Sequence, residues 1–555
     1  MAKINVFVTQ DDLSQYAKKS DQKVPNTGNK YQELANQSDT SLVKLKALGV
    51  KDYTPQTDPS YNQDYHLENP AGFMNDMQSI FKDRQGLWHV YYLNEPTWDI
   101  NGERGNSNWQ HATSTDGTHW VNDDAIAIKS HRLDGSVKWG TIATGSVVIS
   151  DGTIEGTNDG DFVAFFSSFG AKNSGGQSIW AAVSKDNGVT FRSLYDNAVM
   201  PNHENFPDFR DPCVMKHNGK WVMYTAEGQK IGTYTSTNGK NWNYVGGTVT
   251  TGDQFSDGFD YGLIECPYVA QIQADDGSTH WLMFFGCNDY HHGHGAGTSY
   301  LIGNIDENGV FTKVNKETVP VRVDIGTDYY GANFGKIDDK TLITSSWVSN
   351  WDYALEPLTG VDGTQCKKLS SCALFRDLEL VANSEQPSGY ALHQTVRDMV
   401  NRDFALNDDY NRCYDIQAGG EILSTVRNSS IVDFTVNSDD GTGFFTVDVR
   451  QDDAVITLFF DITAGATRIK RHLNGNFISE AFNKETVNVA YGEPNPKKTE
   501  MTIYFDNRTL EIEFKKTGKV FTLLKNAKRT NPSTTLSLQS RDNTLHVNHK
   551  VYQYK

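Results

Sequence analysis

One short turn pattern recurs along the first two thirds of the chain: a polar residue, then Asp or Asn, then Gly, and finally an aromatic residue. Copies lie at residues 114–120, 184–191 and 236–242, with a looser copy at 306–311. An Asp-Gly or Asn-Gly pair supplies the positive φ angles that a tight turn between strands requires. Each copy follows two strand-length, aromatic-rich runs, such as Trp88–Leu93 and Trp109–Thr113. Repeat units of about 50–70 residues that cannot bury both faces alone predict a β-propeller.

The number of units predicts five blades over residues 61–358, because a further strand pair starts at Leu342–Val348. A large β-sandwich with similar hairpins is the alternative. Residues 359–382 are expected to be a linker, and regularly spaced alternating runs beyond it predict a C-terminal β-sandwich over 383–555. Residues 1–60 are polar and are expected to form an N-terminal extension with one short helix near Leu34–Leu48. The predicted fold is therefore all-β, a five-bladed β-propeller followed by a β-sandwich.

Charge and composition exclude several classes of function. The chain has 51 Lys and Arg against 69 Asp and Glu, a net charge of −18, which argues against nucleic acid or an anionic membrane as partner. The sequence contains no apolar run of membrane-spanning length and no CxxC pair, so we expect neither a membrane segment nor a metal or cofactor. A secreted protein whose leader is absent or removed is expected, with a cytoplasmic location as the alternative. The oligomeric state is not predicted.

Three acidic residues each stand at the start of a different predicted blade. Asp76 follows Phe73, Asp211 lies in an Arg-Asp-Pro triplet, and Glu265 precedes Cys266. The inner strands of a propeller converge on one channel, so this shared position predicts that the three carboxylates meet. Cleavage of a glycosidic bond needs one carboxylic acid for the leaving oxygen and a second carboxylate at the sugar carbon.

Aromatic residues close to these acids could form a platform for a sugar ring, or could belong to the cores of the blades. They are Trp109, Trp347, Trp351, Phe73 and Tyr329.

An ordered set of motifs resembles glycoside hydrolase family 32, which contains invertases, inulinases, levanases and related fructosyltransferases. The motifs are Tyr65-His66-Leu67, Phe73-Met74-Asn75-Asp76, Arg210-Asp211-Pro212 and Glu265-Cys266-Pro267. The resemblance implies that Asp76 is the nucleophile of a retaining reaction, Glu265 the general acid/base, and Asp211 a residue that steadies the transition state. It also implies a carbohydrate substrate, fructan or sucrose. Implied substrate contacts are Asn75, Gln78, Phe73, Trp109, Thr144, Ser146, Arg210, Asp328, Tyr329 and Trp347.

Some residues depart from the family pattern. Met77-Gln78-Ser79 stands where Pro-Asn-Gly is common, Phe73 replaces a Trp, and Leu93 replaces a Gln. Together with an open-looking loop at Thr97–Asn108, these departures favour a levan-active branch.

Other functions remain as alternatives. A fructosyltransferase of the same family would pass the sugar to another sugar instead of water, and a non-catalytic propeller would only bind carbohydrate. A sialidase is a third alternative, because residues 184–191 resemble its turns. An inverting enzyme is a fourth, with carboxylates about 6.5–9.5 Å apart instead of about 5–5.5 Å. Cys266 is expected to be a packing residue, and His291-His292-Gly293-His294 a loop that lines the channel.

Overall fold

The computed structural model describes residues 62–96, 107–130, 139–169, 177–202, 208–249, 261–288, 295–354, 368–452, 454–473, 479–525 and 533–555. The expected N-terminal extension with its helix, most of the loop at 97–108 and the histidines at 291–294 lie outside these residues. Regular structure in the described part is almost entirely β. Its two helices, α5 (Val400–Asp403) and α6 (Glu480–Asn483), have four residues each, and neither could cross a membrane.

Five separate sheets, named I to V here, follow one another along the chain as far as residue 396. Sheet I holds β1 (Gly72–Lys82), β2 (Trp88–Glu95), β3 (Asn108–Ser114), β4 (Val121–Ile128) and β20 (Lys368–Leu369). Sheet II holds β5 (Thr141–Asp151), β6 (Asp159–Phe169), β7 (Ser178–Ser184) and β8 (Arg192–Ser193). Sheet III holds β9 (Arg210–His217), β10 (Lys220–Ala226), β11 (Lys230–Ser236) and β12 (Asn243–Val249).

Sheets IV and V continue this order. Sheet IV holds β13 (Glu265–Gln273), β14 (Thr279–Asn288), β15 (Ala296–Ile305), β16 (Phe311–Lys313) and β17 (Val321–Arg322). Sheet V holds β18 (Tyr330–Lys336), β19 (Thr341–Trp347), β21 (Arg376–Ala382) and β22 (Tyr390–Val396). All strand pairs in the five sheets are antiparallel except that of β1 with β20, which is parallel.

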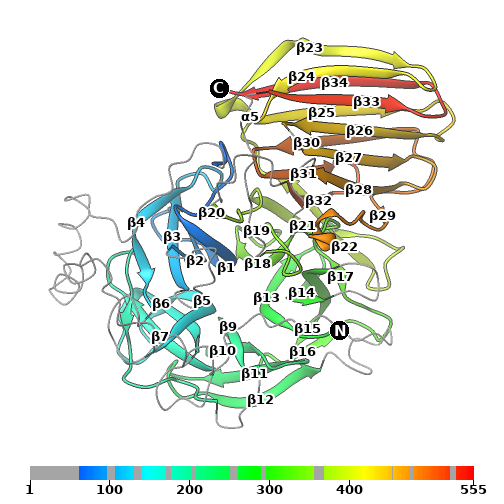
Figure 1. Ribbon diagram of the computed structural model, residues 1–555. Coiled ribbons are helices and arrows are strands. Elements are labelled where there is room, and N and C mark those ends of the chain that lie inside the picture. Colours follow the sequence, from blue (N-terminus) through cyan, green and yellow to red (C-terminus); the bar gives the residue numbers. More distant parts are fainter. Residues whose placement is uncertain are drawn as a thin grey trace.

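The long first strands of the five sheets lie next to one another in a ring. β1 contacts β5, β5 contacts β9, β9 contacts β13, β13 contacts β18, and β18 contacts β1 again. Figure 1 shows these strands near the middle of the lower part, with β4, β7 and β12 farther out. Residues at one end of the first strands are therefore brought together from distant parts of the sequence.

The recurring turn pattern has the same hydrogen bonds in three copies. The Ser114, Ser184 and Ser236 hydroxyls accept hydrogen bonds from the amides of glycines 117, 188 and 239 at 2.8–2.9 Å. These glycines have φ angles between +67° and +84°, where a side chain would be strained. The turn residues therefore stabilise the same turn, between the third and fourth strands, in sheets I, II and III.

The last part of the predicted linker belongs to sheet V, and its residues 359–367 lie outside the described residues. Residues 376–382 form β21, which pairs with β19, and residues 390–396 form β22, which pairs with β21. Both strands complete sheet V, so the boundary predicted at 358 falls inside the last sheet of the ring. Neither strand is followed by the turn pattern, which is why the repeat did not reveal them.

Residues 404–555 form two six-stranded sheets, named VI and VII here. Sheet VI holds β23 (Phe404–Ile416), β34 (Leu545–Tyr554), β25 (Ser430–Asn437), β30 (Lys498–Phe505), β31 (Thr509–Phe514) and β32 (Lys519–Leu524). Sheet VII holds β24 (Glu421–Arg427), β33 (Ser533–Ser540), β26 (Phe444–Gln451), β27 (Ala454–Asp461), β28 (Ala466–Leu473) and β29 (Val489–Ala490).

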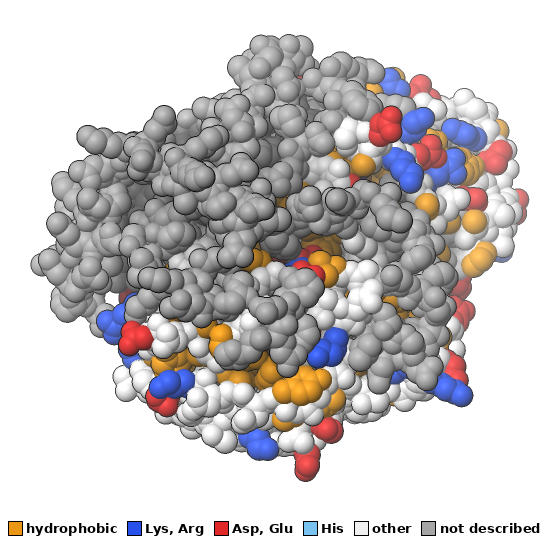
Figure 2. Space-filling view, turned by 60° about the horizontal axis from the view of Figure 1, so that its bottom comes forward, with side chains coloured by type: hydrophobic (Ala, Val, Ile, Leu, Met, Phe, Trp, Pro, Cys, Tyr) orange, Lys and Arg blue, Asp and Glu red, His pale blue; other side chains and the backbone are white. Residues whose placement is uncertain are grey.

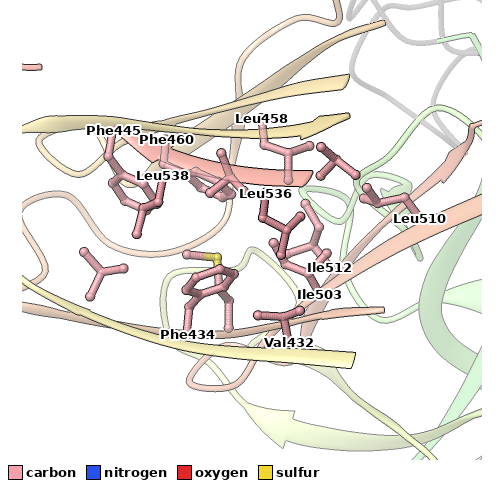
Figure 3. Close-up of a cluster of buried hydrophobic side chains, with 14 of the residues drawn as sticks. Val432, Phe434, Phe445, Leu458, Phe460, Ile503, Leu510, Ile512, Leu536 and Leu538 are labelled. Atoms are coloured by element: carbon pink, nitrogen blue, oxygen red, sulfur yellow. The ribbon is translucent and has the colours of Figure 1, made fainter. Parts of the chain in front are cut away.

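Sheets VI and VII share one hydrophobic core. Phe434 and Ile512 of sheet VI belong to the same buried cluster as Phe460 and Leu536 of sheet VII (Figure 3). Side chains alternate between the two faces of a strand, so the inner face of each sheet is apolar. Burial of this shared face holds the two sheets together.

A buried ionic network joins sheet V to sheet VI. The Arg376 guanidinium on β21 donates to the Asp324 carboxylate at 2.7 Å and to Glu511 on β31, and all three side chains are fully buried. His66 precedes β1, and its Nε2 atom lies 3.2 Å from Glu511 Oε1 while its Nδ1 atom lies 3.0 Å from Asp506 Oδ2. The same hairpin of sheet VI therefore contacts both the start of sheet I and the end of sheet V.

We expect the substitution Arg376→Met to lower the free energy of unfolding by about 3–5 kcal/mol, because it leaves two buried carboxylates without their cation. Denaturant-induced unfolding measures the change. Arg84→Met is the matched control, since Arg84 pairs with Asp159 at 2.6 Å on the exposed surface, and it should change stability little. Equal stability of the two variants would contradict a stabilising role for the network.

Candidate active site

Each of the five first strands carries the same irregularity at the end that opens it. In every case two residues of the first strand lie opposite one residue of the second strand, which is a β-bulge. The bulged pairs are 75–76 on β1, 143–144 on β5, 211–212 on β9, 266–267 on β13 and 331–332 on β18. A bulge changes the direction of the side chains next to it. Five equivalent bulges around the ring therefore direct residues of all five sheets toward the same end of the ring.

The register of the bulges defines equivalent positions in the five sheets. The residues just before the bulge are Met74, Ile142, Arg210, Glu265 and Tyr330. The second residues of the bulge are Asp76, Thr144, Pro212, Pro267 and Ala332. The three expected acids thus occupy three successive positions of the same motif. Glu265 precedes its bulge, Asp211 is the first residue of its bulge, and Asp76 is the second residue of its bulge.

Asp76 is buried and held from one side. The Thr144 hydroxyl, at the equivalent position of the neighbouring sheet, donates to Asp76 Oδ2 at 2.8 Å. Oδ1 has no hydrogen-bond partner in the described part of the chain. Gly331 has a φ of +55°, and a Cβ atom there would lie 2.3 Å from Oδ1, so the glycine leaves the room that this carboxylate occupies. Asp76 therefore has one oxygen fixed and one without a donor, as a carboxylate nucleophile needs.

Glu265 is bound by the two residues at its equivalent positions in sheets III and V. Arg210 Nη2 donates to Glu265 Oε1 at 3.1 Å, and the Tyr330 hydroxyl donates to Oε2. Arg210 is fully buried and also pairs with Asp208. Both oxygens of Glu265 are thus fixed in place by neighbouring sheets.

Asp211 has a backbone conformation that is unusual for a residue with a side chain. Its φ is +60°, and Cys266 at the equivalent position of β13 has a φ of +49°. Left-handed conformations cost about 1–2 kcal/mol each and concentrate at functional sites. The Cys266 amide donates to Asp211 Oδ2 at 2.9 Å, and its sulfur lies 3.8 Å from both Asp211 Oδ2 and Asp76 Oδ2. The described contacts therefore bring Asp76, Asp211 and Glu265 together.

Burial and mutual repulsion shift the titration of this cluster. Burial, with the charges of Glu265 and Asp211, raises the pKa of Asp76 to about 7. Burial raises the pKa of Asp211 to about 6, although Arg210 opposes the change. Buried carboxylates that lie close together cannot all ionise easily, so Asp76 and Asp211 keep their protons to a higher pH than exposed carboxyl groups do. Burial also raises the pKa of the Cys266 thiol well above its usual range, which agrees with a packing role rather than a nucleophilic one.

An aromatic wall adjoins the acids. The rings of Phe73 and Trp347 pack edge to face with their centroids 6.0 Å apart, and the ring centroids of Trp347 and Trp351 are 4.6 Å apart. Trp347 also lies 6.4 Å from the ring of Tyr330, which donates to Glu265. In Figure 2 the molecule is hollowed near the centre of the face shown, and acidic, basic and hydrophobic side chains are visible together there. Acids beside aromatic rings suit the recognition and cleavage of a sugar.

Five residues expected to contact substrate are buried or largely buried and form hydrogen bonds within the protein. Trp109 is fully buried among rings of sheets I and II, and its indole nitrogen donates to the Ala143 carbonyl at 2.9 Å. Asp328 accepts hydrogen bonds from Tyr353, Arg471 and the amide of residue 524, all away from the acids.

The other three of the five are also engaged elsewhere. Tyr329 packs against Arg376 and bonds to Thr344. Gln78 donates to the Asp76 carbonyl at 2.5 Å and accepts from the Gly145 amide at 2.8 Å. Ser146 bonds to the backbone of β9 through both its donor and its acceptor. These side chains are buried and bonded within the protein, so motif similarity had indicated their presence but not their direction.

The remaining expected residues do lie at the site. Asn75 is in the β1 bulge beside Asp76, Thr144 donates to Asp76, Arg210 holds Glu265, and Phe73 and Trp347 form the aromatic wall.

Tyr330 was missed by the sequence-based prediction. The sequence does contain a signal for Tyr330, because this residue directly follows Tyr329. Successive side chains of a strand point to opposite faces, so only one of the two tyrosines can face the acids. In the described residues, no cluster of three or more His, Cys, Asp or Glu side chains could hold a metal ion.

The departures at Met77-Gln78-Ser79 are buried and contact other parts of the protein. Met77 contacts Cys372, Gln78 bonds to β5, and the Ser79 hydroxyl accepts from the Val147 amide at 2.7 Å. These residues join β1 to its neighbours, so they carry no information about the preferred fructan.

Comparison with known proteins adds independent observations. The model of the glycosyl hydrolases family 32 N-terminal domain matches residues 66–392, more than half of the chain. The levanbiose-producing levanase of Bacillus subtilis is 32% identical over 347 residues, covering 60% of this chain and 60% of the relative. Invertase 1 of Saccharomyces cerevisiae is 29% identical over 310 residues, covering 52% of this chain and 53% of the relative. The chain thus matches little more than half the length of these two relatives.

Among solved structures, the exo-inulinase of Aspergillus awamori superposes with a TM-score of 0.76 at 23% identity. The superposition covers 90% of this chain and 99% of the inulinase chain. The likeness therefore extends over sheets I to VII and shows a shared fold.

We expect Asp76→Asn to raise the melting temperature at pH 8 by about 2–4 °C. The pKa of Asp76 is about 7 in the folded chain and near 4 in an unfolded one. At a pH between these two pKa values, folded Asp76 keeps a proton that unfolded Asp76 has lost. The free energy of unfolding therefore falls as the pH rises toward 7. The asparagine removes that loss, and its advantage should shrink at pH 4.5.

Thermal unfolding at both pH values provides the measurement. The control is Asp339→Asn, because that side chain is 86% exposed and should show no such dependence. The raised pKa of Asp76 would be contradicted if Asp76→Asn did not raise the melting temperature at pH 8, or raised it equally at both pH values.

Proposed function

Because the chain belongs to glycoside hydrolase family 32, we propose that it cleaves β-fructofuranosidic bonds in fructans or sucrose with retention of configuration. The observation that carries the proposal is the convergence of Asp76, Asp211 and Glu265 through equivalent bulges of three sheets. The reaction needs a carboxylate nucleophile and a proton donor on opposite sides of one bond. Asp76 and Glu265 have the contacts that suit these two roles.

In the first step, an Asp76 oxygen attacks the anomeric carbon C2 of the fructosyl unit. The bond from C2 to the leaving oxygen breaks, and Glu265 gives its proton to that oxygen. Thr144 holds the other side of the Asp76 carboxylate, so the attacking group does not rotate away. Asp211 faces the same space and would accept hydrogen bonds from hydroxyls of the fructose ring as charge develops.

In the second step, Glu265 takes a proton from water, and the water oxygen attacks C2. The bond between C2 and Asp76 breaks, which restores the carboxylate and releases fructose with its original configuration. Arg210 and Tyr330 hold the two oxygens of Glu265. Among the alternatives, a fructosyltransferase would use the same intermediate with a sugar hydroxyl in place of water.

The proposed architecture is a five-bladed β-propeller of sheets I to V followed by a β-sandwich of sheets VI and VII. The closed ring of contacts among the five first strands supports the first part, and the shared core of sheets VI and VII supports the second. The proposed domain boundary lies between β22 and β23, near residues 397–403.

Levan is the proposed preferred substrate. The support is the identity with the Bacillus subtilis levanase, which exceeds that with the yeast invertase. The aromatic cluster next to the acids includes Trp351, which is only partly buried and therefore has ring surface on which a second fructose unit could stack.

Incubation with levan, inulin and sucrose, followed by chromatography of the products, tests the proposal. We expect sugar release to be fastest from levan, and release of β-fructose as the first product by NMR. Asp76→Ala and Glu265→Ala should each lower kcat by about 10³-fold or more, because each removes a reacting group. A wild-type chain that binds fructan but releases no sugar would instead support a non-catalytic propeller.

A further inference from the structure

Ser167 lies at the point where the bulges of two adjacent sheets meet, although it belongs to neither first strand. It is on β6 and stands opposite the bulged residues Ala143 and Thr144 of β5. The side chain is fully buried, so it does not contact substrate. It is therefore the residue of the second strand that faces the bulge of sheet II.

The Ser167 hydroxyl uses both its donor and its acceptor on backbone groups of the site. It donates to the Thr144 carbonyl at 3.0 Å and accepts from the Asp211 amide at 2.7 Å. These two residues lie 67 positions apart in the sequence and on different sheets. One hydroxyl therefore connects β5 to β9 at the residues that carry the chemistry.

Each end of this bridge leads directly to a carboxylate. Thr144 donates through its own hydroxyl to Asp76 Oδ2, so the position of its backbone sets where the nucleophile is held. Asp211 needs a partner for its amide in order to keep a φ of +60° without loss of a buried hydrogen bond. The bridge thus couples the position of the nucleophile to that of the second carboxylate.

The residues opposite the other four bulges do not form such a bridge. They are Leu93, Thr225, Phe285 and Ser346. Leu93 and Phe285 have no side-chain donor, Thr225 donates to Glu227, and Ser346 donates to the carbonyl of Trp347 within its own sheet. A bridge between two first strands is therefore particular to Ser167 among the five equivalent positions.

We propose that Ser167 is a positioning residue, whose hydroxyl fixes the relative placement of the Asp76 and Asp211 carboxylates for fructosyl transfer. The proposal rests on the proposed function of this site. Displacement of reacting groups by about 1 Å can lower turnover by about 10²-fold, even when binding changes little. The expected signature is a loss in kcat that is larger than any change in KM.

Ser167→Ala tests the proposal, with Ser168→Ala as the matched control. Ser168 is the next residue of β6, is equally buried, and accepts from the Gly140 amide at 2.9 Å, a group outside the two bulges that Ser167 connects. We expect Ser167→Ala to lower kcat on levan or sucrose by about 10- to 100-fold, with KM within about threefold. Ser168→Ala should keep kcat within about twofold at a comparable loss of melting temperature.

Ser167→Thr retains a hydroxyl and should recover most of kcat, which a role in packing alone would not explain. Equal kcat losses in Ser167→Ala and Ser168→Ala, or a Thr variant as slow as the Ala variant, would overturn the proposal.

Hydrogen exchange of the Asp211 amide gives a second readout that does not depend on turnover. We expect faster exchange in the peptide spanning 208–214 in Ser167→Ala but not in Ser168→Ala, because only the first removes the acceptor. Unchanged exchange would overturn the bridge itself. A wild-type chain without activity on any fructoside, but with this exchange difference, would instead overturn the proposed function.

Discussion

The candidate site depends on five bulges that stand in the same register around a closed ring of strands. A regular strand end would alternate its side chains between two faces, and neighbouring sheets would present unrelated residues to the channel. The bulge adds one residue to each first strand, which brings Asp76 of one sheet beside Thr144 of the next and places Arg210 and Tyr330 on either side of Glu265. The arrangement of these side chains is thus a result of backbone geometry repeated five times.

This geometry has a cost that the surrounding structure offsets. Three buried carboxylates lie close together, and two non-glycine residues there adopt left-handed backbone conformations. Side chains from neighbouring sheets supply the compensating hydrogen bonds: Gln78, Ser79, Ser146 and Ser167 each bond to the backbone of an adjacent first strand. First strands of different sheets do not form a ladder with one another, so these polar side chains perform the linking that backbone groups perform inside a sheet.

Several features of this arrangement could be predicted from the sequence, and others could not. The turn pattern revealed the repeated units, and the three acids followed from their position at the start of a unit. The bulge register could not be predicted, because it depends on pairing between strands. For that reason Tyr330 was missed in favour of Tyr329, and Gln78 and Asp328 were assigned to substrate although they bond within the protein. The end of sheet V was missed because β21 and β22 have no turn pattern and follow a long connection.

The parallel pairing of β20 with β1 brings the chain back from sheet V to sheet I, at the seam where the ring begins and ends. The hairpin of β30 and β31 binds both sides of that seam, through His66 on one side and Arg376 on the other. A ring built from one continuous chain is weakest where its two ends meet. Sheet VI therefore stabilises this seam. A fragment that ended after β22 would keep Asp76, Asp211 and Glu265, but its seam would depend on the contacts of β1 with β18, β19 and β20 alone among the described strands.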